Sequence, residues 1–277
     1  MKPGPSPGPG DSPTGTVGVN PAMSRIAVTG SASGIGAAIR ARLEAGNAKV
    51  IGVDLREAEV IADLSRPDGR AAAVAEVRAA CHGHLDGLVV CAGVGPHVEP
   101  WSTIVSVNYF GAQALLAGLR ETLAAGDAPA AVAVSSNSAV LPGADTPLVA
   151  ACLAGEEDEA RRLAHELDGH RAYAGSKLAL LRWTRRHAPG PGWAVAGVRL
   201  NAVAPGPVRT PLLEDSLTHP LYGPAIRDFP VPLGGFGAPQ DVAAAVAFLL
   251  GPEAAFCCGS VLFVDGGTDA LLRPDMV

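Results

Sequence analysis

A tyrosine and a lysine lie four residues apart in the segment Tyr173-Ala174-Gly175-Ser176-Lys177. On a helix this spacing places the phenol of Tyr173 and the ammonium group of Lys177 on one face, about one turn apart. A free phenol has a pKa of about 10, and a nearby positive charge is needed to lower it toward neutrality. The pair could therefore act as an acid and base in proton transfer. The same spacing also occurs in ordinary solvated helical pairs, so other residues must decide.

Two further polar positions adjoin or interrupt apolar stretches. Ser135 and Ser136 directly follow the apolar run Ala131–Val134. A hydroxyl at the carboxyl end of such a strand can hold a substrate oxygen, although a purely structural role stays open. Asn108 interrupts another apolar stretch. A buried amide there could fix a water molecule or a backbone carbonyl, and a helix cap is the alternative.

A glycine-rich turn follows the first apolar run of the chain. Its sequence is Thr29-Gly30-Ser31-Ala32-Ser33-Gly34-Ile35-Gly36, with the glycines spaced GxxxGxG. Glycines permit a tight turn and a close approach of backbone N–H groups to a pyrophosphate, and the dipole of the following helix faces the anion. Between a strand and a helix, this turn predicts a dinucleotide site. A turn needed only for tight packing is the alternative.

An acidic residue, Asp54, ends the second apolar run, Val50–Asp54. A carboxylate at this position accepts hydrogen bonds from both ribose hydroxyls and repels a 2′-phosphate, which favours NAD over NADP. Arg56 stands two residues later and could bind a phosphate, so NADP stays open as the less favoured cofactor. A solvated turn residue is the alternative role for Asp54.

Short apolar runs alternate with Ala-rich helical stretches from Arg25 onward. The predicted strands are Ile26–Thr29, Val50–Asp54, Leu88–Cys91, Ala131–Val134, Val198–Val203 and Val261–Val264. Apolar strands separated by helices indicate a parallel sheet covered on both faces, which is a doubly wound, Rossmann-type α/β fold. No internal repeat or linker divides residues 25–277, so we expect a single domain. Residues 1–24 are mostly Pro, Gly, Ser and Thr, which predicts a disordered tail without a function.

Composition excludes several classes of protein. The chain is 48% hydrophobic and 17% charged, as expected of a packed globular protein, and its net charge of −6 with no basic cluster argues against nucleic acid as a partner. The five cysteines are odd in number and lack a CxxC pair, so neither a disulfide framework nor a metal site is expected. The sequence shows no membrane-spanning or secretory segment. A cytoplasmic location is expected.

Together these motifs resemble the short-chain dehydrogenase/reductase family, in the family's order, from about residue 25 to about residue 270. The resemblance rests on TGSASGIG, Asp54, Asp63-Leu64, Cys91-Ala92-Gly93, Asn108, Ser136, Tyr173, Lys177 and Pro205-Gly206. It implies that Tyr173 exchanges a proton with the substrate and that Lys177 lowers the pKa of the phenol and holds the ribose. It further implies that Ser136, rather than Ser135, orients the carbonyl, and that Asn108 anchors a relay water.

The resemblance also implies which residues contact the cofactor. Asp63 and Leu64 would flank the adenine, and Val208 and Thr210 would meet the nicotinamide carboxamide. The implied contacts are Gly30, Ser33, Gly34, Ile35, Gly36, Asp54, Asp63, Leu64, Cys91, Ala92, Gly93, Tyr173, Lys177, Pro205, Gly206, Val208 and Thr210. Position 91 is usually Asn in the family. We expect Cys91 to alter a structural hydrogen bond and not the chemistry.

Two segments depart from the usual family lengths. The stretch from Gly93 to Asn108 is short, whereas residues 137–172 form an insertion before the helix that carries Tyr173. Together with Asp265-Gly266-Gly267 and Arg273-Pro274, these departures resemble the bacterial 3α-hydroxysteroid dehydrogenase/carbonyl reductase group. That helix commonly packs against a partner subunit in the family, so we expect the insertion to block this contact and to leave a homodimer through the C-terminal sheet edge. Its charged part, Glu156–Arg162, is expected to be a solvated helix.

Apolar side chains recur among Pro and Gly in residues 210–235: Leu212, Leu213, Leu217, Leu221, Tyr222, Ile226 and Phe229. This pattern predicts a mobile lid over an apolar substrate, with core packing as the alternative. With the resemblance, it implies an NAD-dependent enzyme that interconverts a hydrophobic secondary alcohol and its ketone, such as a 3α-hydroxysteroid or another carbonyl compound. An NADPH-dependent ketoreductase of natural-product biosynthesis and a non-catalytic dinucleotide sensor are the alternatives.

Overall fold

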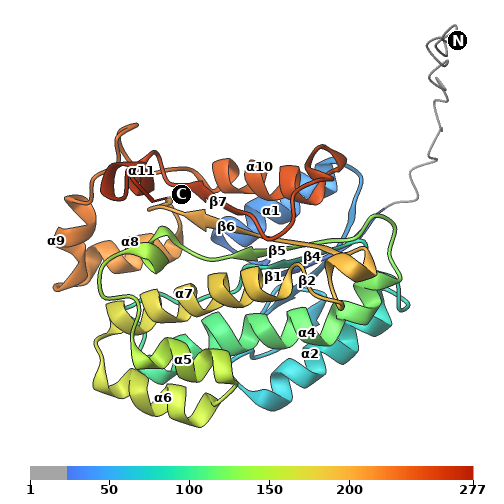
Figure 1. Ribbon diagram of the computed structural model, residues 1–277, viewed down its shortest axis with the longest axis horizontal. Coiled ribbons are helices and arrows are strands. Elements are labelled where there is room, and N and C mark those ends of the chain that lie inside the picture. The colour runs from blue at the N-terminus through green and yellow to red at the C-terminus, as the bar shows by residue number, and fades with distance from the viewer. Residues whose placement is uncertain (1–23, 277) are drawn as a thin grey trace, which may run out of the picture.

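The computed structural model describes residues 24–276, in which a central sheet lies between two layers of helices (Figure 1). Apart from Ser24, the predicted tail over residues 1–24 lies outside the described residues. The strands are β1 (Arg25–Thr29), β2 (Lys49–Asp54), β3 (Val60–Ile61), β4 (Gly87–Val90), β5 (Ala130–Val134), β6 (Arg199–Pro205) and β7 (Val261–Val264). They form one sheet in the order β3-β2-β1-β4-β5-β6-β7, and every neighbouring pair is parallel. The predicted doubly wound α/β fold is confirmed.

All six predicted strands are present, with ends that differ from the prediction by no more than a residue or two. The seventh strand, β3, was not predicted from the sequence, and it pairs with β2 through Val60 and Ile61 only. A strand this short carries no alternation that a sequence pattern could reveal. The strand order reverses between β1 and β4, and this reversal leaves a crevice at the carboxyl ends of the strands.

Helices cover both faces of the sheet because its strands are apolar on both sides (Figure 1). On one face, α1 and α10 pack against each other and against alternate strand residues such as Ile26 and Val28. On the other face, α2, α4 and α7 pack on the intervening residues, including Ala27. The helices of these two layers are α1 (Gly34–Ala45), α2 (Pro67–Ala80), α4 (Ala112–Ala124), α7 (Gly169–His187) and α10 (Pro239–Leu250).

A π-helical turn interrupts the long helical segment that ends with α4. Helix α3 (Trp101–Val105) leads directly into the π-turn η1 (Ser106–Gly111), which continues into α4. A π-turn packs one extra residue into a helical turn and is frequent at functional sites. The turn contains the candidate residue Asn108.

Residues 137–172, the predicted insertion, are helical and well packed. It comprises the 3₁₀ turn η2 (Asn137–Val140), α5 (Pro147–Ala154), α6 (Glu157–Glu166) and the start of α7. Helix α5 packs against α7, and α6 packs against α3 and α5. Figure 1 shows α5 and α6 stacked outside α7 on the lower face of the molecule.

The prediction of a solvated helix for residues 156–162 is right for its outer face and wrong for Glu157. Glu159 and Arg162 pair with each other at the surface. The carboxylate of Glu157 instead points inward and pairs with the buried guanidinium of Arg70. A charge run in the sequence does not reveal this difference, because the buried cation lies far away in the chain.

Thr29 joins β1 to the end of β4. Its side-chain oxygen Oγ1 accepts hydrogen bonds from the backbone N–H groups of Cys91 at 3.0 Å and Ala92 at 2.9 Å. The threonine itself is buried. This contact holds the loop after β4 beside the glycine-rich turn, of which Thr29 is the first residue.

We expect Thr29→Val to lower the free energy of unfolding by about 2–4 kcal/mol, because the N–H groups of Cys91 and Ala92 would both lose the acceptor that the buried Thr29 supplies. Thr29→Ser keeps the oxygen and is the matched control. Urea denaturation monitored by circular dichroism measures both variants. A larger loss for Ser than for Val would show that the methyl group, and not the hydroxyl, stabilises this position.

Candidate active site

A cavity of about 530 Å³ opens at the carboxyl ends of the strands. All the predicted site residues except Asn108 line it. They are Gly30, Ser33, Gly34, Ile35, Gly36, Asp54, Asp63, Leu64, Cys91, Ala92, Gly93, Ser136, Tyr173, Lys177, Pro205, Gly206, Val208 and Thr210. Residues from seven separate stretches of the chain thus meet in one space.

The glycine-rich turn lies so close to its surroundings that side chains are excluded at two positions. Gly30 has a φ of +70°, and a Cβ atom there would lie 2.8 Å from the Cα of Ala92. A Cβ at Gly36 would lie 1.9 Å from the carbonyl oxygen of Gly30. The turn then enters α1 at Ser33, whose side chain makes no capping hydrogen bond. The Ser33 side chain therefore does not occupy the backbone N–H groups at the start of α1. These N–H groups are the donors that a bound phosphate requires.

Asp54 is held at the end of β2 with its carboxylate toward the glycine-rich turn. Its Oδ2 accepts a hydrogen bond from the backbone N–H of Ala32 at 2.9 Å, and its Oδ1 accepts one from Leu55 at 2.7 Å. The neighbouring Arg56 is exposed. The carboxylate is thus a charged group fixed at this edge of the cavity.

Helix α7 carries both Tyr173 and Lys177 to the cavity, which confirms that the two residues share one helical face. The Nζ atom of Lys177 lies 5.9 Å from the centre of the Tyr173 ring and donates a hydrogen bond to the carbonyl of Val134 at 3.1 Å. This bond ties the lysine to the end of β5, directly before the two serines.

The two serines after β5 point in different directions. The Ser135 hydroxyl donates to the carbonyl of Lys177 at 2.9 Å and so secures α7. The Ser136 hydroxyl interacts with the Tyr173 phenol and accepts a hydrogen bond from the backbone N–H of Ser138. Its oxygen also lies 3.0 Å from the hydroxyl of Ser138. This geometry favours Ser136 over Ser135 as the group that faces a substrate oxygen.

Burial shifts the pKa of three groups in this part of the cavity. It raises the pKa of Tyr173, and the interaction with Ser136 acts in the opposite direction. It lowers the pKa of Lys177 to about 8 and raises that of the Cys91 thiol to about 12. In each case removal from water disfavours the charged form. Cys91 is consequently an uncharged thiol near neutral pH, in keeping with the expectation that it does not take part in the chemistry.

Asn108 is buried beneath the cavity and does not line it. Its Oδ1 accepts a hydrogen bond from the backbone N–H of Val94 at 2.9 Å, and its Nδ2 donates to the carbonyl of Val94 at 3.1 Å. The residue therefore fixes a backbone carbonyl, one of the two roles expected for a buried amide. A Cβ at Gly93 would lie 3.1 Å from Oδ1 of Asn108 and 3.3 Å from Nζ of Lys177, so these polar atoms approach each other across a glycine.

Several residues that line the cavity were not predicted from the sequence. His170 precedes Tyr173 by three positions on α7, so helical spacing could have identified it. Ser138 and Leu141 belong to the start of the insertion, where the chain turns back toward the site. No regular spacing marks those two positions.

The predicted lid region consists of two short helices, α8 (Pro211–Thr218) and α9 (Tyr222–Arg227), at one end of the molecule (Figure 1). Five of its predicted apolar residues line the cavity: Leu212, Leu213, Tyr222, Ile226 and Phe229. Leu217 and Leu221 do not, and Leu221 is exposed. The region thus supplies an apolar wall, and its mobility stays a prediction.

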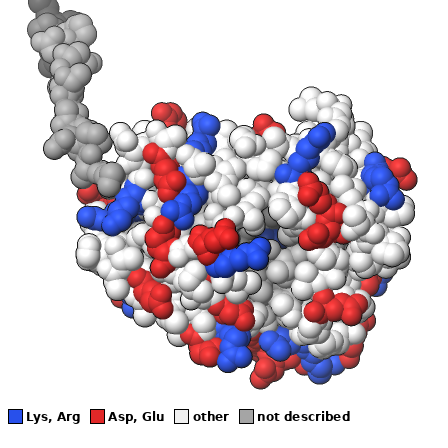
Figure 2. All heavy atoms as spheres, turned by 180° about the vertical axis from the view of Figure 1, so that it is seen from behind, with Lys and Arg blue, Asp and Glu red and all other residues white. Residues whose placement is uncertain are grey.

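Charged residues of both signs are interspersed over the face drawn in Figure 2. None of the helices formed by residues 24–276 has the length and apolarity that a bilayer crossing requires. Within the same residues, His84, Asp86 and Asp127 form one group with metal-ligand chemistry. It lies at the amino ends of β4 and β5, away from the cavity, and both oxygens of Asp86 already accept backbone hydrogen bonds.

The low pKa of Lys177 gives a testable dependence of stability on pH. Between about pH 8, its folded value, and its ordinary value of 10.5, the unfolded chain binds more protons than the folded chain. The contribution of Lys177 to the free energy of unfolding therefore rises with pH in this window and is lost as the pH falls toward 8. Relative to Lys177→Met, we expect the native protein to gain up to about 3 kcal/mol across the window. Urea denaturation of both proteins without cofactor measures this difference, and parallel pH profiles would contradict it.

Comparisons with known proteins agree with this geometry. The family model described as short chain dehydrogenase matches residues 24–171, and the one described as enoyl-(acyl carrier protein) reductase matches residues 166–269. The chain is 47% identical to the 3-alpha-hydroxysteroid dehydrogenase/carbonyl reductase of Comamonas testosteroni, over 91% of this chain and 99% of that protein. It is 32% identical to the cis-4-hydroxycyclohexanecarboxylate dehydrogenase of Sinomonas cyclohexanicum, over 89% of this chain and 97% of that protein.

A solved structure is similar over the whole described fold. The 3-alpha-hydroxysteroid dehydrogenase from Pseudomonas sp. B-0831, crystallised in complex with NADH, is 53% identical and superimposes with a TM-score of 0.90. The match covers 92% of this chain and 100% of that one. The sheet order, the cavity and these similarities together show that the chain belongs to the short-chain dehydrogenase/reductase family.

Proposed function

We propose that this chain is an NAD-dependent oxidoreductase that interconverts a hydrophobic secondary alcohol and the corresponding ketone. One observation carries the proposal. The phenol of Tyr173, the hydroxyl of Ser136 and the ammonium group of Lys177 meet in a cavity that also contains the glycine-rich turn and an apolar wall. Neither a simple dinucleotide sensor nor a structural protein requires an acid/base group at the meeting point of these features.

The residues of the cavity fit NAD. The glycine-rich turn has no room for side chains at Gly30 and Gly36, so its backbone can approach a pyrophosphate. The carboxylate of Asp54 can accept hydrogen bonds from the two hydroxyls of a ribose. The remaining implied contacts, among them Leu64 beside the adenine and Thr210 near the carboxamide, line the same cavity. When bound, NAD supplies the acceptor for a hydride, and NADH supplies the donor.

Tyr173 exchanges the proton that accompanies this hydride transfer. As a phenolate it removes the proton of the alcohol, and as a phenol it returns a proton to the ketone oxygen. Burial alone raises the pKa of Tyr173, so the positive charge of Lys177, 5.9 Å from the ring centre, is required to favour the phenolate. Ser136 holds the substrate oxygen, and Asn108 supports the site through the Val94 backbone and anchors a relay water.

A steroid or another hydrophobic carbonyl compound is the proposed class of substrate. The apolar wall from α8 and α9 favours such a molecule, and relatives named for 3-alpha-hydroxysteroids cover nearly the whole chain. Helices α8 and α9, with the flanking residues of 210–235, are proposed to act as the substrate lid. The catalytic domain is proposed to span residues 25–277, with residues 137–172 as its insertion.

We also propose a homodimer through the C-terminal edge of the sheet. Strand β7 lies at this edge, whereas α5 of the insertion covers the outer side of α7 and α6 packs on α5. Apolar side chains are exposed on β7, on the end of α10 and on the segments that flank them: Phe248, Phe256, Leu262, Leu271 and Leu272. A second copy of the chain would bury them. The proposed compartment is the cytoplasm, which is supported by five cysteines that are all free.

Oxidation of NADH and NADPH in the presence of a panel of steroid, aromatic and aliphatic ketones tests the proposal. We expect turnover with NADH, highest for bulky apolar ketones, and much weaker turnover with NADPH because Asp54 repels its 2′-phosphate. A preference for NADPH would contradict the proposed cofactor. NADH binding without turnover of any ketone in the panel would favour the dinucleotide sensor.

Tyr173→Phe tests the proposed proton transfer. Loss of the phenol oxygen should lower kcat by at least about 100-fold, since general acid–base catalysis contributes factors of this size. The dissociation constant for NADH, measured by fluorescence titration, should change little. A variant that retains turnover would exclude Tyr173 as the acid and base.

A further inference from the structure

Arg70 is a buried cation that the proposed chemistry does not use. It lies in the first turn of α2 and is only 7% exposed. Its Nη1 and Nη2 atoms each donate to one oxygen of the Glu157 carboxylate at 2.6 Å. A guanidinium and a carboxylate joined at two points in this way have a strongly fixed relative orientation. The pair links α2 with the insertion, because Glu157 is the first residue of α6.

The same guanidinium holds the loop that is proposed to flank the adenine. Its Nε donates to the carbonyl of Leu64 at 2.8 Å, and Nη2 donates to the carbonyl of Ser65 at 3.1 Å. Leu64 and the preceding Asp63 line the cavity. Arg70 therefore lies behind the adenine wall and supports its backbone without touching the cavity itself.

At two glycines, the neighbouring backbone lies very close to this loop. A Cβ at Gly69 would lie 2.1 Å from the carbonyl oxygen of Asp63, and a Cβ at Gly111 would lie 3.1 Å from the Cβ of Leu64. The loop thus packs so closely against α2 and the π-turn η1 that a side chain at either glycine would force it to shift. A small displacement of Arg70 would open this contact and move Leu64.

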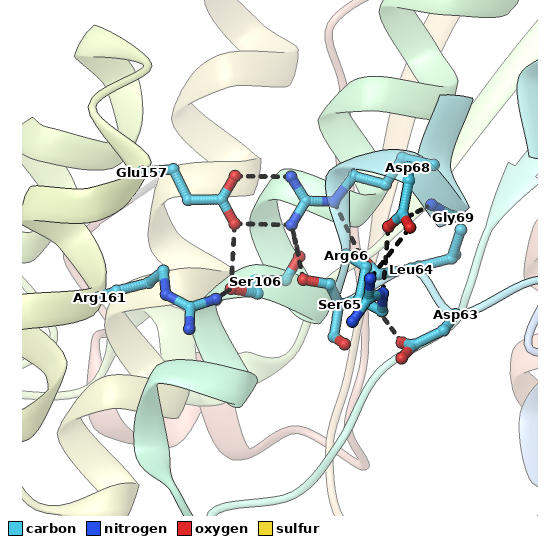
Figure 3. A network of polar contacts seen from close by, with 10 residues as sticks. Asp63, Leu64, Ser65, Arg66, Asp68, Gly69, Ser106, Glu157 and Arg161 are labelled. Carbon is cyan, nitrogen blue, oxygen red and sulfur yellow. Dashed lines mark hydrogen bonds and ion pairs between the residues drawn. The ribbon is translucent and has the colours of Figure 1, made fainter. Parts of the chain in front are cut away.

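Glu157 holds the guanidinium from the side opposite the loop. Its Oε1 also accepts a hydrogen bond from the Ser106 hydroxyl at 3.0 Å, and Ser106 accepts one from Arg161 at 2.9 Å (Figure 3). Burial acts to raise the pKa of Glu157, but the contacts with Arg70 and Ser106 outweigh it and leave the pKa below its ordinary value. The carboxylate is therefore charged near neutral pH and balances the charge of Arg70.

We infer that Glu157 and Arg70 are positioning residues for the adenine half of the cofactor, and that the insertion thereby sets the affinity for NAD. This inference rests on the proposed NAD-dependent function. Glu157 fixes the guanidinium, the guanidinium fixes the carbonyls of Leu64 and Ser65, and these fix the wall against which the adenine packs. The reacting end of the cavity is held separately, through Thr29, Ser135 and the carbonyl of Val134.

The test compares how tightly the full-length protein binds each of the two halves of the cofactor. Glu157→Gln keeps the shape of the side chain but removes the charge and one of the two acceptors. We expect its dissociation constants for NADH and for ADP-ribose, measured by calorimetry, to rise roughly tenfold, which corresponds to about 1.4 kcal/mol. The dissociation constant for reduced nicotinamide mononucleotide, which lacks the adenosine half, should stay within about twofold of the native value.

Glu159→Gln is the matched control, because it makes the same substitution one half-turn later on the exposed side of α6. It should leave all three dissociation constants unchanged. If Glu157→Gln does not fold, as judged by circular dichroism, Glu157→Asp carries the same test, since the shorter carboxylate cannot reach both nitrogen atoms. An equal loss of affinity for both halves would show a merely structural role and overturn the inference. Unchanged affinity for ADP-ribose would also overturn it.

The two proposals fail in different ways. If the native protein binds neither NADH nor ADP-ribose, the proposed function itself is wrong. If the native protein binds both and Glu157→Gln binds them equally well, the function stands and only the role of the Glu157–Arg70 pair is wrong.

Discussion

The site depends on the divergence of two neighbouring parallel strands. After β1 the chain passes to the helix layer of α1 and α10, and after β4 it passes to the opposite layer. The crevice between them is lined by backbone, and backbone can approach a ligand closely only where side chains are missing. Gly30 and Gly36 supply that condition on one side, and Gly93 supplies it on the other. The hydroxyl of Thr29 keeps the two sides at a fixed distance.

Burial shifts the pKa values of the reacting groups, and it also removes the hydration that would stabilise their charges. Lys177 is a cation removed from water, and its pKa falls accordingly. The fold compensates with the Val134 carbonyl, while Ser135 secures the backbone of α7 at the same residue. The same balance between burial and fixed partners recurs at Arg70, where the loss of hydration is offset by a carboxylate and by backbone carbonyls.

Local patterns allowed much of the fold and site to be predicted from the sequence. Apolar runs located the long strands, and the four-residue spacing of Tyr173 and Lys177 placed both side chains on one helical face. The family resemblance supplied the roles. Contacts between distant parts of the chain were beyond such reasoning, because no pattern relates Arg70 to Glu157. The π-turn at Asn108 was equally hidden, since an extra residue in a helical turn leaves the composition of the segment unchanged.

The pairing of Arg70 with Glu157 also bears on how the insertion can change during evolution. A deletion that trimmed α6 would uncover α3 and α5, against which α6 packs, and at the same time leave a guanidinium in the interior without its counter-charge. Such an unpaired buried charge destabilises a protein by several kcal/mol, roughly 3–5 kcal/mol in comparable cases. A shorter descendant would therefore need a neutral residue in place of Arg70 before, or together with, the deletion. Residues 137–172, with the Glu157 carboxylate, are consequently difficult to lose in a single step.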